Sequence, residues 1–137
     1  MAFQGNATCD VFKLGLINGQ FNFDGTQAYK IALYNNTATL NAETTTYTIV
    51  GEISGAGYTA GGAAVTPIED IANGTAFITF ANVTWSGAFT ARGALIYQVS
   101  SGTAVCVLDF GSDKVSQNTF TVQFPESGAT TALIRLS

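Results

Sequence analysis

Short runs of strand-forming residues, divided by turn residues, occupy most of this chain. Apolar residues alternate with other residues over 28–33 and 120–124, and β-branched and aromatic residues dominate 77–85. Turn signals such as Asn18-Gly19 divide the runs at roughly the eight- to twelve-residue spacing that is typical of β-sandwiches. No segment of a dozen residues keeps the apolar spacing of an amphipathic helix without a glycine or β-branched interruption. The pattern predicts an all-β fold, as an antiparallel β-sandwich or jelly roll.

A glycine-rich segment interrupts the strand pattern in the middle of the chain. Five of the residues in 51–62 are glycines, which predicts a central loop with several positive φ angles. The segment is superficially similar to a phosphate-binding loop, but it lacks the Gly-Lys-Ser/Thr ending and a following helix pattern. We therefore expect a structural loop.

The length of 137 residues is sufficient for one domain with its own core. We assign 28–137 to the β-sandwich core. Residues 1–27 combine aromatic and turn residues, which leaves two alternatives open: a first hairpin of the core, or an arm that lies on a neighbouring subunit. Under the second alternative, the candidates for intersubunit docking are Phe3, Phe12, Phe21 and Phe23.

Charged residues make up only 10% of the chain, against about a quarter in an ordinary soluble domain. Either neutral polar residues solvate the surface, or other subunits cover much of it. The five basic residues are spread along the chain, which argues against nucleic acid as a partner. No apolar run is long enough to cross a membrane, and no secretory signal is visible, so we expect synthesis in a cytoplasm.

The residue types needed for common catalytic sites are missing or scattered. Without histidine, a Ser-His-Asp or Cys-His arrangement and a usual zinc site are excluded. The one adjacent carboxylate pair, Glu69-Asp70, is interpreted as a solvated turn between strands, and no calcium-loop spacing surrounds it. We expect a protein without cofactor, metal or catalytic residues.

Two charged residues lie within apolar strands. Arg92 and Asp109 belong to segments that one short hairpin joins, and a buried charge requires a partner. We expect them to form a structural ion pair, or one of them to pair with Glu52. Cys106 is interpreted as a small core residue, and a disulfide with Cys9 would require an oxidising compartment.

Several blocks, in order, resemble a family of small virion structural proteins of tailed bacteriophages. They are residues 29–34, 51–62, 91–97, 104–111 and 120–125, and the resemblance extends over about 28–136. It implies a structural role in the particle and no catalytic residues.

With the sparse charge, the resemblance leads us to expect a capsid decoration or cement protein on the outer surface of the phage head. It would be made in the host cytoplasm and would bind the major capsid protein and itself, as a homo-oligomer that we expect to be a trimer. The alternatives are a tail or neck component, and a carbohydrate-binding module at a fibre tip. A small carboxylate-dependent glycosidase or lyase is the remaining class. For the sugar-binding alternative, the candidate stacking residues are Tyr34, Tyr47, Tyr58, Trp85 and Tyr97.

Overall fold

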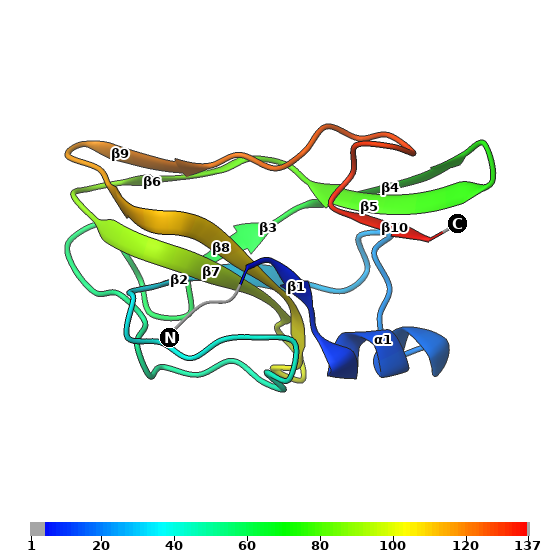
Figure 1. The fold of residues 1–137 in the computed structure, drawn as a ribbon, viewed down its shortest axis with the longest axis horizontal. Coiled ribbons are helices and arrows are strands. Elements are labelled where there is room, and N and C mark those ends of the chain that lie inside the picture. The colour runs from blue at the N-terminus through cyan, green and yellow to red at the C-terminus, as the bar shows by residue number, and fades with distance from the viewer. Residues whose placement is uncertain (1–4, 137) are drawn as a thin grey trace.

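Two layers of antiparallel strands enclose the core in the computed structural model, which describes residues 5–136 (Figure 1). The prediction of an all-β antiparallel sandwich is confirmed. The elements are β1 (Ala7–Thr8), α1 (Asp10–Ile17), β2 (Tyr29–Tyr34), β3 (Ala63–Val65), β4 (Pro67–Ala72), β5 (Thr75–Phe80), β6 (Val83–Ser86), β7 (Thr90–Gln98), β8 (Ala104–Val115), β9 (Thr119–Val122) and β10 (Ile134–Leu136).

A five-stranded sheet with the order β1-β8-β7-β2-β3 forms one layer. Its central strands are buried on both faces, as β7 is from Ala94 to Gln98 and β8 is from Ala104 to Leu108. One face packs against the second layer, and the long connection 35–62 passes over the other (Figure 1). This double cover explains why these strands are apolar at consecutive positions instead of alternating.

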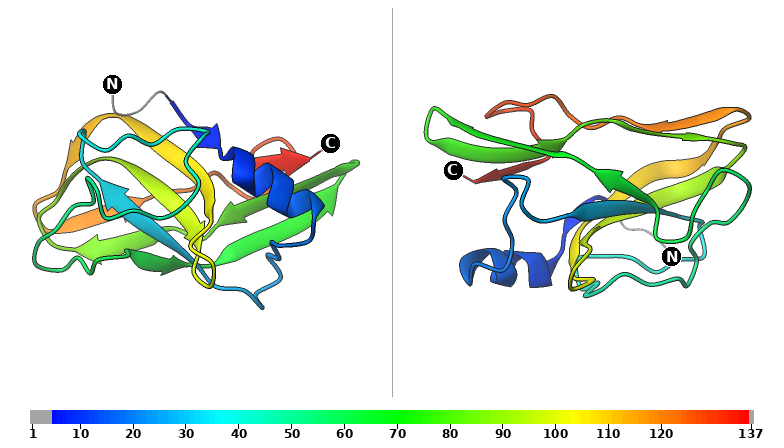
Figure 2. Two further views of the ribbon diagram at one scale, coloured as in Figure 1. Left: turned by 90° about the horizontal axis from the view of Figure 1, so that it is seen from below. Right: turned by 180° about the vertical axis from the view of Figure 1, so that it is seen from behind.

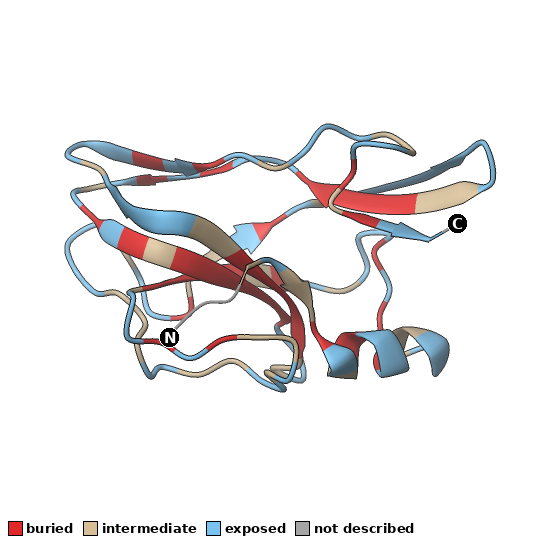
Figure 3. Ribbon diagram, viewed as in Figure 1, coloured by how far each residue is buried: buried red, intermediate tan, exposed pale blue. Residues whose placement is uncertain are grey.

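The second layer consists of two smaller sheets. One has three strands in the order β10-β5-β4, and the other pairs β6 with β9. Phe80, Trp85 and Phe120 project from this layer into the core. The β4–β5 hairpin extends to one end of the molecule, where much of its surface is exposed (Figure 3).

The N-terminal segment differs from both predicted alternatives, because it contains a helix. Phe12, Phe21 and Phe23 belong to the same core cluster as the sandwich residues. Their predicted role in docking on a neighbouring subunit is therefore wrong for this conformation. Phe3 lies outside the described residues.

Helix α1 depends on one close contact that the sequence pattern conceals. Of its eight residues only Phe12 and Gly15 are buried. A Cβ at position 15 would collide with the ring of Phe21, so glycine lets this ring lie against the helix. The glycine that interrupts the helical pattern is thus the residue that lets the helix pack.

Candidate interaction surface

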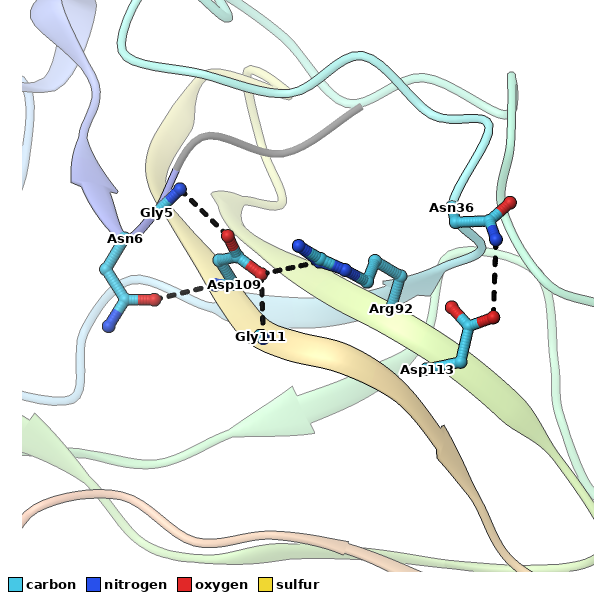
Figure 4. A network of polar contacts seen from close by, with 7 residues as sticks. All are labelled: Gly5, Asn6, Asn36, Arg92, Asp109, Gly111 and Asp113. Atoms are coloured by element: carbon cyan, nitrogen blue, oxygen red, sulfur yellow. Dashed lines mark hydrogen bonds and ion pairs between the residues drawn. The ribbon is translucent and has the colours of Figure 1, made fainter. Parts of the chain in front are cut away.

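Arg92 of β7 and Asp109 of β8 form the ion pair expected from the sequence (Figure 4). Arg92 Nη1 lies 2.9 Å from Asp109 Oδ1, and the two side chains are 18% and 10% exposed. Two backbone amides, of Gly5 and Gly111, also donate to the Asp109 carboxylate, each at 2.8 Å. The Asp109 amide in turn donates to Asn6 Oδ1 at 2.6 Å. The carboxylate therefore joins the N-terminal segment to both strands, which is a structural role.

Glu52 pairs with neither of these residues and instead holds the glycine-rich loop together. The hydroxyls of Tyr47 and Tyr58 donate to its two carboxylate oxygens at 2.5 and 2.6 Å. The Gly61 amide adds a third donor at 2.8 Å. All five glycines of 51–62 have positive φ, so the backbone can curl around this carboxylate. The sequence analysis missed this cluster.

The tyrosine hydroxyls of this cluster have altered acidity. Burial, and then the hydrogen bond to Glu52, raises the pKa of Tyr58 and of Tyr47. Burial, and then the negative charge of Glu52, raises the pKa of Tyr34, whose hydroxyl donates to the Thr48 carbonyl at 2.6 Å. These hydroxyls thus remain protonated donors and are poor acids or nucleophiles.

The aromatic residues considered for sugar stacking do not form an exposed platform. Tyr34, Trp85 and Tyr97 are buried, and Tyr97 donates its hydroxyl to the Gly61 carbonyl at 2.6 Å. The rings of Tyr47 and Tyr97 stack on each other with centroids 4.7 Å apart. These faces are therefore engaged within the chain.

The two cysteines are free and buried. Thr8 is paired with Cys106, and Cys9 follows in extended conformation, so the two thiols point to opposite faces of the sheet. Burial, and then the charge of Asp10, raises the pKa of Cys9 to about 11, and burial raises that of Cys106. Both thiols remain protonated and unreactive at neutral pH.

Glu69 and Asp70 lie on strand β4 and not on a turn, which corrects the sequence interpretation. The turn is Asn73-Gly74, with φ angles of 53° and 77° that suit a type I′ hairpin. Within residues 5–136, no three His, Cys, Asp or Glu side chains are grouped so that they would hold a metal ion.

Exposed apolar residues gather on α1 and the three-stranded sheet, which lie at the same end of the molecule (Figure 2). Ile17 of α1 is 86% exposed, Ile71 of β4 67% and Leu136 of β10 52%. The other exposed apolar residues are scattered, as Ile49 in a loop, Val99 in a turn and Val115 at the end of β8 are, and scattered exposure of this kind is normal. The gathering at one end of the molecule is typical of a contact surface.

A groove of about 510 Å³ separates α1 from β10, and we call it the β10 groove. Its apolar lining comes from both elements, and its charged residues are Lys13 and Arg135. A second groove, of about 530 Å³, lies between the α1 region and the three-stranded sheet, and Glu69 and Asp70 are among its lining residues. Both grooves share Leu16, Ile134 and Leu136, so they form one continuous surface, the helix-end surface.

Comparisons with models of protein families, with curated proteins and with solved structures found no match for this chain. Among the helices of the described part, none has the length and apolar character to cross a membrane.

Proposed function

We propose that this chain is a structural virion protein of a tailed bacteriophage and decorates the head shell, where it binds the major capsid protein. The helix-end surface carries the proposal, because it joins exposed apolar side chains to two strand edges that have no neighbouring strand within residues 5–136. Surfaces of this kind are characteristic of subunits that bury them in an assembly. The sparse charge and the resemblance of 28–136 to virion proteins support the same role.

The distribution of polar groups also favours binding over catalysis. The carboxylates with the most hydrogen bonds, Glu52 and Asp109, hold loops and strands of the chain itself. The remaining cleft carboxylates, Glu69 and Asp70, lie next to each other on an exposed strand and so point to opposite faces of the sheet. A glycosidase needs two carboxyl groups that face the same bond.

The burial of the tyrosine and tryptophan rings weakens the sugar-binding alternative. A platform for a sugar needs a planar ring face that is open to solvent, and Tyr34, Trp85 and Tyr97 offer none. A tail or neck position would use the same helix-end surface with fewer copies. Copy number therefore separates the two structural roles.

The deciding experiment is to count this chain against the major shell protein in purified particles by quantitative mass spectrometry. A ratio near one to one supports decoration of the head lattice. A ratio of a few per hundred shell subunits contradicts decoration and places the chain in the tail, neck or fibre. Absence from purified particles refutes a virion role altogether.

A further inference from the structure

The three-stranded sheet ends in two strands that lack a neighbour on one side. Its order is β10-β5-β4, and within residues 5–136 neither β10 nor β4 pairs with a further strand. An unpaired edge presents backbone N–H and C=O groups that readily accept another strand. Strand β4 is accessible for pairing, because every residue after Pro67 is exposed.

The two edges carry opposite charge. Glu69 and Asp70 lie on β4, whereas Lys13 and Arg135 line the β10 groove, which contains no acidic residue. Two of the five basic residues of a chain with net charge −4 thus gather beside one edge. The nearest acid to Lys13 is Asp10, at 3.6 Å in an exposed pair, and such pairs contribute little. Arg135 donates one N–H to the Thr130 carbonyl at 2.7 Å and has further donors in its guanidinium group.

The pleat of the sheet sorts these residues by face. Through β5, Asp70 aligns with Phe77 and Arg135, whereas Ile71 aligns with Ala76 and Leu136. Directly paired residues point to the same side of a sheet. Asp70 and Arg135 therefore share one face of the sheet, and Ile71 and Leu136 share the other. Glu69 lies on the same face as Ile71, beside the apolar residues.

This arrangement is self-complementary between two copies. With β4 of one copy beside β10 of another and Asp70 opposite Arg135, the same register places Ile71 beside Leu136. A slip by one residue would move Asp70 to the apolar face of β10 and would move Ile71 to the face that carries Arg135. The unshifted register is therefore the one that brings Asp70 to Arg135 and Ile71 to Leu136 at the same time.

We propose that copies of this chain associate head to tail, with the β4 edge of one copy added to the β10 edge of the next and filling the β10 groove. This inference rests on the proposed assembly function and names a second copy as the occupant of the surface. Each copy keeps one free edge of each kind, so the contact repeats until a ring closes or a chain of subunits grows. Strands β4 and β10 both run antiparallel to β5. Within one copy β4 and β10 therefore run in the same direction. A rotation about an axis parallel to the strands keeps that direction, so β4 of one copy would pair in parallel with β10 of the next.

Disulfide trapping tests the contact directly on the full chain. One chain carries Asp70→Cys and a second carries Arg135→Cys, and the two are mixed and oxidised. We expect a covalent heterodimer on a non-reducing gel, because directly paired strand residues lie within disulfide reach. Within one copy β5 separates the two positions by about 10 Å, which is too far for a bridge. The native thiols are buried.

Matched controls distinguish a specific contact from random bridging between exposed cysteines. As a control, a Glu43→Cys chain carries the cysteine at an exposed position outside β4. We expect no bridge between the Glu43→Cys chain and the Arg135→Cys chain. Either single-cysteine chain alone should stay unbridged. Bridging of Asp70→Cys to itself, or of Glu43→Cys as fast as Asp70→Cys, would overturn the head-to-tail contact.

Charge exchange provides a second, reversible test by light scattering at tens of micromolar. We expect Asp70→Arg and Arg135→Glu each to weaken association at least tenfold, and the double variant to recover most of it. Glu43→Arg, with the same change of charge, should associate like the unaltered chain. A monomeric unaltered chain, or single variants that associate normally, would refute the inference. Since copy number in particles is measured separately, either proposal can fail while the other stands.

Discussion

The glycine-rich loop 51–62 and helix α1 lie at opposite ends of the sandwich (Figure 1), and the two ends use their polar and apolar groups in opposite ways. We call the end that contains the loop 51–62 the tyrosine end. There, the Glu52 carboxylate accepts hydrogen bonds from the hydroxyls of Tyr47 and Tyr58 and from the Gly61 amide of the glycine-rich loop. At the helix end, two backbone edges and several apolar side chains have no cover within residues 5–136. The groups of one end are thus satisfied within the chain, whereas those of the other end are the ones that we propose to be covered by association.

The largest expected effect is a loss of stability when a side chain is added where the glycine-rich loop packs closely against β2. A Cβ at Gly62 would collide with the Ile31 carbonyl oxygen, at a φ of 85°. We expect Gly62→Ala to lower the free energy of unfolding by about 4 kcal/mol or more, measured by urea unfolding. In the control, Gly74→Ala at the β4–β5 turn, an added Cβ meets nothing within 4 Å. Its cost should be about 1–2 kcal/mol from its positive φ alone. Equal costs would show that the tyrosine end is not tightly closed.

Helix α1 has a buried face, which should contribute to stability, and an exposed face, which should not. Phe12 is 1% exposed and contacts the rings of Phe21 and Phe23. We expect Phe12→Ala to cost about 3–5 kcal/mol in thermal or urea unfolding. Ile17→Ala, on the exposed face, should change stability by less than about 0.5 kcal/mol at concentrations where the chain is monomeric. A large loss at Ile17 would mean that the exposed face already belongs to the folded core.

Glu52 provides a smaller test of the tyrosine end. Glu52→Leu removes the acceptor of the Tyr47 and Tyr58 hydroxyls and of the Gly61 amide. The expected loss is about 2–3 kcal/mol, because partly buried donors lose a charged partner. Glu43→Leu serves as the control, since this side chain is exposed, and should be nearly neutral. If both variants unfold alike, the hydrogen bonds of Glu52 do not stabilise the loop.

The smallest effect is a loss of stability in alkali. Burial raises the pKa of Tyr34 and Tyr58 above the ordinary value of 10.0. Above that pH the unfolded chain releases protons that the folded chain retains, so the free energy of unfolding falls as pH rises. We expect a loss of about 1 kcal/mol for each of these two tyrosines over the first pH unit above 10. Urea unfolding across this range should show a shallower decline for Tyr34→Phe, and an unchanged slope would contradict the role of burial.

The sequence predicted the strands better than it predicted what surrounds them. Strand propensity and the hairpin between β7 and β8 brought Arg92 and Asp109 together as candidates for an ion pair, because the two strands are neighbours in sequence. The alternative of a pair with Glu52 stayed open until the structure showed the contact of Arg92 with Asp109. Helix α1 was missed because it is short, contains Gly15 and depends on the distant ring of Phe21. The position of Glu69 on β4 was missed although Asn73-Gly74 is a strong hairpin signal.

The hydrogen-bond partners of Glu52 could not be predicted from sequence patterns. Tyr47 and Tyr58 converge on this carboxylate through a loop whose course depends on five positive φ angles. Composition indicates that such a loop exists, but the direction of each turn follows from contacts with strands far along the chain. Gly62, which lies against Ile31, is one such contact.

The attachment of the N-terminal segment to β8 affects the order of events during synthesis. The Gly5 amide and the Cys9 amide bond to Asp109 and Val105, about a hundred residues later in the chain. At roughly 5–20 residues per second, a ribosome needs about 5–20 s to produce those partners. The apolar residues of α1 and its neighbours must wait through this interval without their core. The nascent chain is then most exposed to aggregation and most dependent on chaperones, and folding completes only when β8 has emerged.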